Sequence, residues 1–198
     1  VISAIIGAIW GDINGALILG LLCQLYFLGG FSIGVSMPPD ETLPTTVIVA
    51  SALWASAGIT PEARPALEGI VLAAGLPLAQ IGRAVERRTL DVNISATIVA
   101  ADRLKSGDDS GLFRLNAFGV LRNFVQWAIL SLIGIGLIGG LAVPVYKILP
   151  EGLRLGFEFF RQGFFFIGVI IAFRVLRVKK KILAFLAGAA GGILILVI

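Results

Sequence analysis

The sequence predicts an all-α, polytopic helical membrane protein with short or broken (re-entrant) helices and a cytoplasmic amphipathic helix. Hydrophobic residues make up 58% of the 198 residues and charged residues 14%, whereas a soluble domain carries about 25% charged residues. Too little polar side chain is available to cover a globule in water, and the mean hydropathy of +0.99 agrees. Apolar segments in the first third of the chain are short and interrupted, and one central polar segment carries apolar residues at helical spacing.

The N-terminal apolar segments are each too short for an ordinary crossing. Residues 1–10 would extend about 15 Å as a helix, half of a bilayer, so we expect the end of a helix that begins upstream or a half-span. Residues 11–15 combine glycine with Asp and Asn and predict a turn. Residues 16–28 form a second short run, and residues 29–39 are predicted to be irregular. Irregular backbone at membrane depth requires polar partners or a water-filled cavity.

A polar segment divides the remaining chain. Residues 45–57 are apolar, residues 58–69 predict a turn, and residues 70–81 are apolar around Pro77. Residues 83–114 hold most of the polar side chains. Within them an amphipathic surface helix is predicted over residues 89–106, because apolar side chains recur at helical spacing at Leu90, Ile94, Ile98, Ala101 and Leu104.

The C-terminal part contains the clearest crossings. Residues 124–145 and 159–176 are long apolar runs, joined by an amphipathic connector, and residues 182–198 are uncharged. We therefore expect a single membrane domain with three parts, namely a broken-helix substrate region (1–82), a cytoplasmic amphipathic segment (83–118) and a helical bundle (119–198).

Lysine and arginine set the predicted orientation. They are most frequent in residues 83–122 and 174–181, which two crossings separate, so both segments are expected on the cytoplasmic side of a bacterial inner membrane. Because the basic residues flank apolar segments, the positive-inside rule and anionic headgroups explain the net charge of +4, and nucleic acid is excluded as a partner.

Polar residues among the interrupted segments are candidates for a solute site, because polar groups inside a membrane are costly and mark pathways. No lysine or arginine precedes Arg64, so an anion is disfavoured. A neutral sugar or polyol fits, since its hydroxyls bind carboxylates and amides, and a cation fits equally well on charge. The candidates are Asp12, Asn14, Gln24, Ser32, Ser36, Asp40, Glu41 and Thr42.

Simpler roles are open for the same residues. Asp40 or Glu41 could cap the following helix in a loop at the membrane surface, and Asp12 in its Gly-Asp turn is more typical of a cap than of a ligand. Gln24 could bind another helix through its amide. Cys23, the single cysteine, is expected to be a small buried hydrophobic residue.

The stretch GDINGALILGLLCQLYFLGGFSIGVSMPPDETLPTTVIVAS, residues 11–51, resembles the IIC membrane subunit of the mannose family of the bacterial phosphoenolpyruvate-dependent sugar phosphotransferase system (PTS). The ordered features are a Gly-Asp turn, a helical glycine (Gly20), Gln24, Leu-Gly, Ile-Gly and Pro-Pro-Asp. RAVERRTLDVNISATIVAADRLKSGD, residues 83–108, is similar to the cytoplasmic helix of that family.

The resemblance implies a permease subunit of the mannose/fructose/sorbose family that takes up a hexose during its phosphorylation. It implies a second membrane subunit, IID, in a trimer of IIC–IID heterodimers, and cytoplasmic IIA and IIB phosphocarriers. The chain contains no histidine, so it cannot carry the phosphohistidine, which is expected on IIB. Neither a cofactor nor a metal is predicted.

The resemblance places sugar binding first at Gln24 and Asp40, and second at Asp12, Asn14, Glu41 and Thr42. We expect Gln24 and the loop of residues 32–42 to hold the sugar and to move relative to the bundle of residues 124–198, and the helix at 89–106 to help present the sugar to IIB. The family has a further N-terminal stretch of about one helix, so this chain is expected to be a fragment or a shortened member.

Three other functions are weighed against this one. A secondary carrier would use Asp12, Asp40 and Glu41 for a proton or cation without phosphorylation. An intramembrane enzyme of lipid or phosphate metabolism is disfavoured by the missing histidine and by the lack of basic residues near the acidic loop. A structural subunit would only support IID.

Overall fold

The computed structural model describes residues 1–28, 40–105 and 111–175, and this part of the chain is helical without strands. The all-α prediction is therefore confirmed. The helices are α1 (Ile2–Trp10), α2 (Ile13–Phe27), α3 (Thr42–Ser56), the 3-10 turn η2 (Pro61–Ala63), α4 (Arg64–Gly75), α5 (Leu78–Lys105), α6 (Leu112–Ile148) and α7 (Glu151–Val175). Residues 29–39, with the candidates Ser32 and Ser36, and most of the basic segment 174–181 lie outside the described residues.

Helix length separates the two parts of the chain. Helices α1 to α4 have 9, 15, 15 and 12 residues, fewer than the roughly 20 that a crossing needs. Three stretches among the described residues are long and apolar enough to cross a membrane, namely Pro61–Asp102, Phe113–Ile148 and Glu151–Phe173. The predicted combination of short helices with long crossings is confirmed.

Several connections are shorter than the sequence predicted. Arg64 already begins α4, because Pro65 has a backbone angle suited to a first helical turn. The break around Pro77 lies between α4 and α5, where the proline cannot continue the hydrogen-bond ladder. Only Leu149 and Pro150 separate α6 from α7, so most of the predicted connector is helical.

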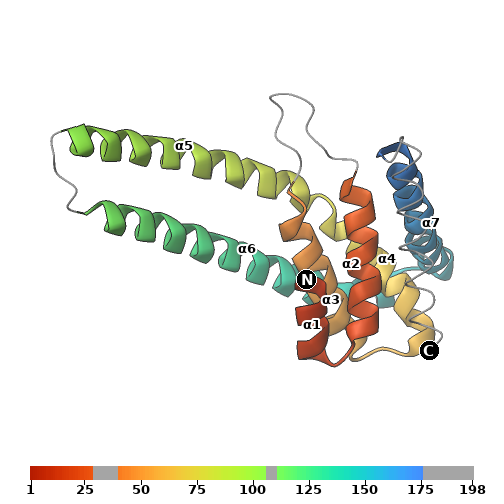
Figure 1. Cartoon of the computed structure of the whole chain (residues 1–198). Coiled ribbons are helices and arrows are strands. Elements are labelled where there is room, and N and C mark those ends of the chain that lie inside the picture. The colour runs from red at the N-terminus through yellow and green to blue at the C-terminus, as the bar shows by residue number, and fades with distance from the viewer. Residues whose placement is uncertain (29–39, 106–110, 176–198) are drawn as a thin grey trace.

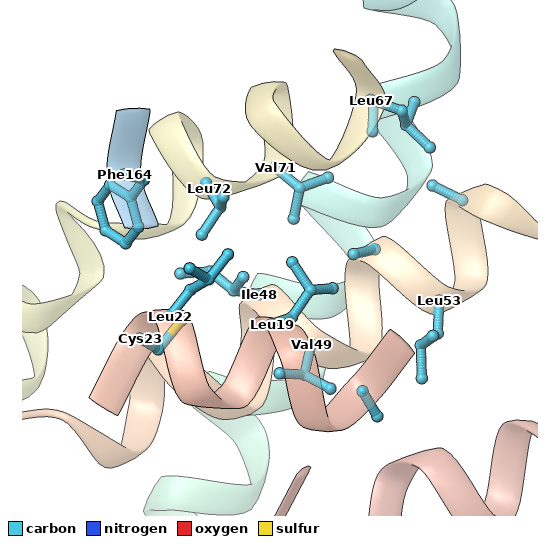
Figure 2. Close-up of a cluster of buried hydrophobic side chains, with 14 of the residues drawn as sticks. Leu19, Leu22, Cys23, Ile48, Val49, Leu53, Leu67, Val71, Leu72 and Phe164 are labelled. Atoms are coloured by element: carbon cyan, nitrogen blue, oxygen red, sulfur yellow. The ribbon is translucent and has the colours of Figure 1, made fainter. Parts of the chain in front are cut away.

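The core lies among α2, α3, α4 and α7. Figure 2 shows Leu19 and Leu22 of α2 facing Ile48 of α3 and Leu72 of α4, with Phe164 of α7 beside them. All are buried, and so is Cys23, as predicted for a free cysteine. Since burial of a large apolar side chain contributes about 1.5–3 kcal/mol, this cluster fixes the short helices against one another and against α7.

Helix α5 and the first half of α6 form an arm that projects from the bundle as an antiparallel pair (Figure 1). Thr89 and Gln126 join the two helices with a hydrogen bond of 3.2 Å from the Gln126 amide to the Thr89 hydroxyl. The predicted amphipathic helix is the outer part of α5, and its apolar residues Leu90, Ile94 and Ile98 are exposed. The predicted boundaries at 82/83 and 118/119 fall inside α5 and α6, which continue without a break.

Candidate functional site

The predicted binding residues lie at two ends of α2. Asp12 and Asn14 are at its start, and Gln24 is twelve positions beyond Asp12, about 18 Å along the helix axis. Asp40 and its neighbours Glu41 and Thr42 precede or begin α3, at the same end of the bundle as the C-terminal end of α2 (Figure 1). The structure therefore places Gln24 and residues 40–42 at one end, and Asp12 and Asn14 at the other.

Asp40 caps α3 with both carboxylate oxygens. Its Oδ1 accepts from the Thr42 amide at 3.1 Å and its Oδ2 from the Leu43 amide at 3.0 Å. The side chain also lies against Gly82 of α5, where a Cβ atom would come within 2.9 Å of the Asp40 Cβ. The capping role weighed from the sequence is therefore present. A carboxylate has about four acceptor sites, so a capping Asp40 can still accept from a sugar hydroxyl.

Glu41 and Thr42 are exposed beside Asp40. Glu41 occupies the N-cap position, but its side chain makes no capping bond. The carbonyl of Thr42 accepts from the Thr46 hydroxyl at 2.8 Å. The start of α3 thus presents a carboxylate and a hydroxyl next to the capped Asp40.

Gln24 is exposed on a stripe of α2 that also carries Asn14, Leu17 and Leu21, at spacings that put all four on one face. An amide on an otherwise apolar face is costly in a bilayer unless it finds a partner. A bound solute or a polar group of a neighbouring membrane subunit would satisfy Gln24.

Asp12 belongs to a chain of four alternating charges. It caps α2 by accepting from the Gly15 amide at 2.8 Å, and it pairs with Arg64. Arg64 Nε lies 2.7 Å from Glu68 Oε1, and Arg161 of α7 binds the other oxygen of Glu68. The Glu68 side chain is 3% exposed. The cap at Asp12 is confirmed, whereas the expectation that no basic residue lies near the acidic candidates is wrong at Asp12.

The functional candidates predicted from the sequence did not include Arg64, Glu68 and Arg161. Arg64 and Glu68 are four residues apart, a spacing that lets them pair on one helix. Arg161 stands in an otherwise apolar helix, where a charge needs a partner. Those two signals could have indicated the network, but only the fold brings Asp12 to Arg64, 52 positions away.

The network keeps Asp12 ionised. The hydrogen bond from the Gly15 amide lowers the pKa of Asp12 below its usual value of 3.8, and Arg64 lowers it further, outweighing partial burial. An Asp with a lowered pKa does not exchange protons near neutral pH, which disfavours Asp12 as the proton site of a secondary carrier.

A cavity of about 430 Å³ lies away from these residues, between the arm helices. Its polar lining includes Asn93 and Thr97 of α5 and Asn116 and Asn123 of α6. None of the six predicted binding residues lines it, so it does not support the predicted site.

Comparison with known proteins identifies the family. The family described as "PTS system sorbose-specific IIC component" matches residues 1–193. The chain belongs to this family. The IIC chain is also 26% identical over 161 residues to "Fructose permease IIC component" of Bacillus subtilis (strain 168), covering 79% of this chain and 56% of the relative. It thus spans little more than half the length of that curated relative.

A solved structure shares the fold of this IIC chain. "Structure of membrane protein" aligns with a TM-score of 0.61 and 17% identity, covering 94% of this chain and 72% of the other. Together with the three apolar stretches, the family places the chain in a membrane.

Proposed function

We propose that this IIC chain binds a hexose and translocates it across the bacterial inner membrane, where a partner subunit phosphorylates it. The match of residues 1–193 to the sorbose-specific IIC family carries this proposal. The polar groups at the joined end of α2 and α3 support it, because an amide, two carboxylates and a hydroxyl suit a neutral sugar.

The sugar site consists of Gln24 together with residues 40–42. Gln24 and Asp40 make the main contacts, and Glu41 and Thr42 add a carboxylate and a hydroxyl beside them. Asp12 and Asn14, at the opposite end of α2, are secondary, and the ion pair with Arg64 makes Asp12 the weaker candidate. Hydrogen bonds to sugar hydroxyls give specificity because buried polar groups left unpaired are costly.

The family to which the chain belongs suggests the partners, and the sequence itself contains no histidine to carry a phosphoryl group. A soluble IIB subunit supplies the phosphoryl group from a phosphohistidine, after transfer from IIA. A IID subunit completes the membrane unit in a trimer of heterodimers. The exposed arm, with its basic residues Arg87 and Arg88, helps to present the sugar site to IIB on the cytoplasmic side.

Uptake by vesicles containing IIC with its PTS partners tests the site. Asp40→Asn keeps one oxygen to cap the helix but removes the charge, and Gln24→Ala removes the amide. Both variants should insert normally and lose coupled uptake. Glu62→Ala, an exposed acid outside the site, is the matched control and should transport normally.

The product inside the vesicles tests the reaction class. Sugar phosphate is expected, whereas accumulation of unmodified solute would instead indicate a secondary carrier. Normal uptake kinetics in both Asp40→Asn and Gln24→Ala would remove the site assignment while leaving the family unaffected.

A further inference from the structure

Helix α5 carries a buried glycine, Gly82, inside a regular helix. Among the described glycines, only Gly11 and Gly111 have positive φ angles, so the backbone conformation at position 82 does not require glycine. Glycine is also less favourable than alanine in the interior of a helix. A glycine at such a position has a packing or functional reason, and we therefore looked for the atoms that occupy the space beside it.

That space is occupied by Asp40, the residue that caps α3. The three heavy atoms nearest to a Cβ added at Gly82 are Oδ2, Cβ and Cγ of Asp40, with Cβ at 2.9 Å and Cγ at 3.0 Å. Rotation of the carboxylate cannot relieve this overlap, because the Cβ of Asp40 is itself too close. Leu43 and Pro44 in the first turn of α3 are buried and hold the start of that helix. A methyl group at position 82 would therefore displace Asp40.

The two carboxylate oxygens of Asp40 have different surroundings. Oδ2 accepts from the Leu43 amide in a partly buried hydrogen bond, and it is the oxygen that an added Cβ at Gly82 would meet. Oδ1 accepts from the Thr42 amide in an exposed hydrogen bond. A carboxylate oxygen has about two acceptor sites, so Oδ1 keeps one on the exposed side. Oδ1 is therefore the oxygen that is available to a sugar hydroxyl.

We propose that Gly82 is a positioning residue of the sugar site. Its missing side chain lets the Asp40 carboxylate lie with Oδ2 against α5 and Oδ1 available to the sugar. This inference rests on the proposed function, and Gly82 acts through Asp40 without touching the sugar. Restoring an ordinary carbon–carbon distance at position 82 requires a shift of about 0.5–1 Å, and binding groups have to be held within about 0.5 Å.

Uptake of a labelled hexose that the unmodified protein transports, in vesicles with the PTS partners, tests the role of Gly82. In Gly82→Ala the KM for uptake should rise about tenfold or more, the loss of one hydrogen bond to a charged group, while the maximal rate changes much less. Gly156→Ala, the same change at an exposed helical glycine with open space around it, is the matched control and should leave both values unchanged. An unchanged KM in Gly82→Ala would overturn the inference.

A double-mutant cycle tests the contact without transport. Asp40→Gly removes all three atoms that the methyl group would meet, so Gly82→Ala should lower the Tm of the unmodified protein in detergent but not that of Asp40→Gly. Equal lowering in both backgrounds would show that Gly82 serves packing alone and would contradict the proposal. If Gly82→Ala does not fold, recovery of folding in the double variant supports the contact with Asp40, and failure of both variants contradicts it.

The Asp40→Asn variant separates this inference from the proposed function. If Asp40→Asn loses uptake while Gly82→Ala keeps its KM, the sugar site stands and the positioning role of Gly82 is wrong. If Asp40→Asn transports normally, the assignment of Asp40 to the sugar site fails, and the positioning role fails with it.

Discussion

Asp12 shows how local and distant contacts combine at a single residue. The Gly15 amide fixes its carboxylate within one turn, and Arg64 reaches it from α4. Arg64 is in turn shared with the buried Glu68, which Arg161 binds from α7. Asp12 is therefore one end of a network of two carboxylates and two guanidinium groups, which joins α2, α4 and α7.

The pH dependence of the ion pair follows from the lowered pKa of Asp12. A carboxylate whose pKa is lowered in the folded state stabilises the protein fully at pH values above its unfolded-state pKa, near 3.8. This stabilisation is lost as the pH falls through the folded-state pKa. Asp12→Asn keeps the cap and removes the charge, so the free energy of unfolding should fall by about 1 kcal/mol or less for this partly exposed pair. In thermal unfolding, the difference in stability between Asp12→Asn and the unmodified protein should be constant from about pH 5 to pH 8. It should shrink only in stronger acid. A difference that changes with pH through neutrality would contradict the ionised state.

At the scale of elements, glycine decides which helices approach closely. Gly69 of α4 faces the Phe157 backbone, whereas Gly156 of α7 has open space around it. The two positions carry the same residue in helices, yet their surroundings differ completely. Their substitutions should therefore have opposite effects.

Gly69→Ala should destabilise the protein by about 1–3 kcal/mol or more, because the methyl group meets backbone that cannot move aside easily. Gly156→Ala should be neutral or stabilising by up to about 1 kcal/mol, since alanine favours a helix over glycine. Thermal unfolding in detergent measures both. Equal small effects would show that α4 and α7 are further apart than the structure has them.

The whole molecule has a packed bundle and a projecting arm (Figure 1). Apolar residues of the arm are exposed in the single chain. Exposed apolar surface of this extent is covered by lipid or by another subunit. The basic residues of α5 lie on the arm, so the positive-inside rule gives the molecule one expected orientation.

Labelling from one side of the membrane checks that orientation. Ser95→Cys, at an exposed position of the arm, is introduced in a Cys23→Ala background. A membrane-impermeant thiol reagent should label it in inside-out vesicles and leave it unlabelled in right-side-out vesicles. The reverse pattern would place the arm on the outer face.

The sequence by itself determined the membrane environment, the all-α class and the position of most helices, because composition and hydrophobic periodicity are local properties. It also indicated the caps at Asp12 and Asp40, which depend on neighbours within three residues. Helix α5 extends across position 82/83 and α6 across position 118/119, because polar residues mark a surface without ending a helix.

Only the tertiary structure decided which distant residues meet. It joined Glu68 to Arg161, 93 positions away. It also placed Gly69 against α7. Such contacts depend on how helices pack as rigid bodies, and neither the spacing nor the charge of residues along the chain specifies that packing.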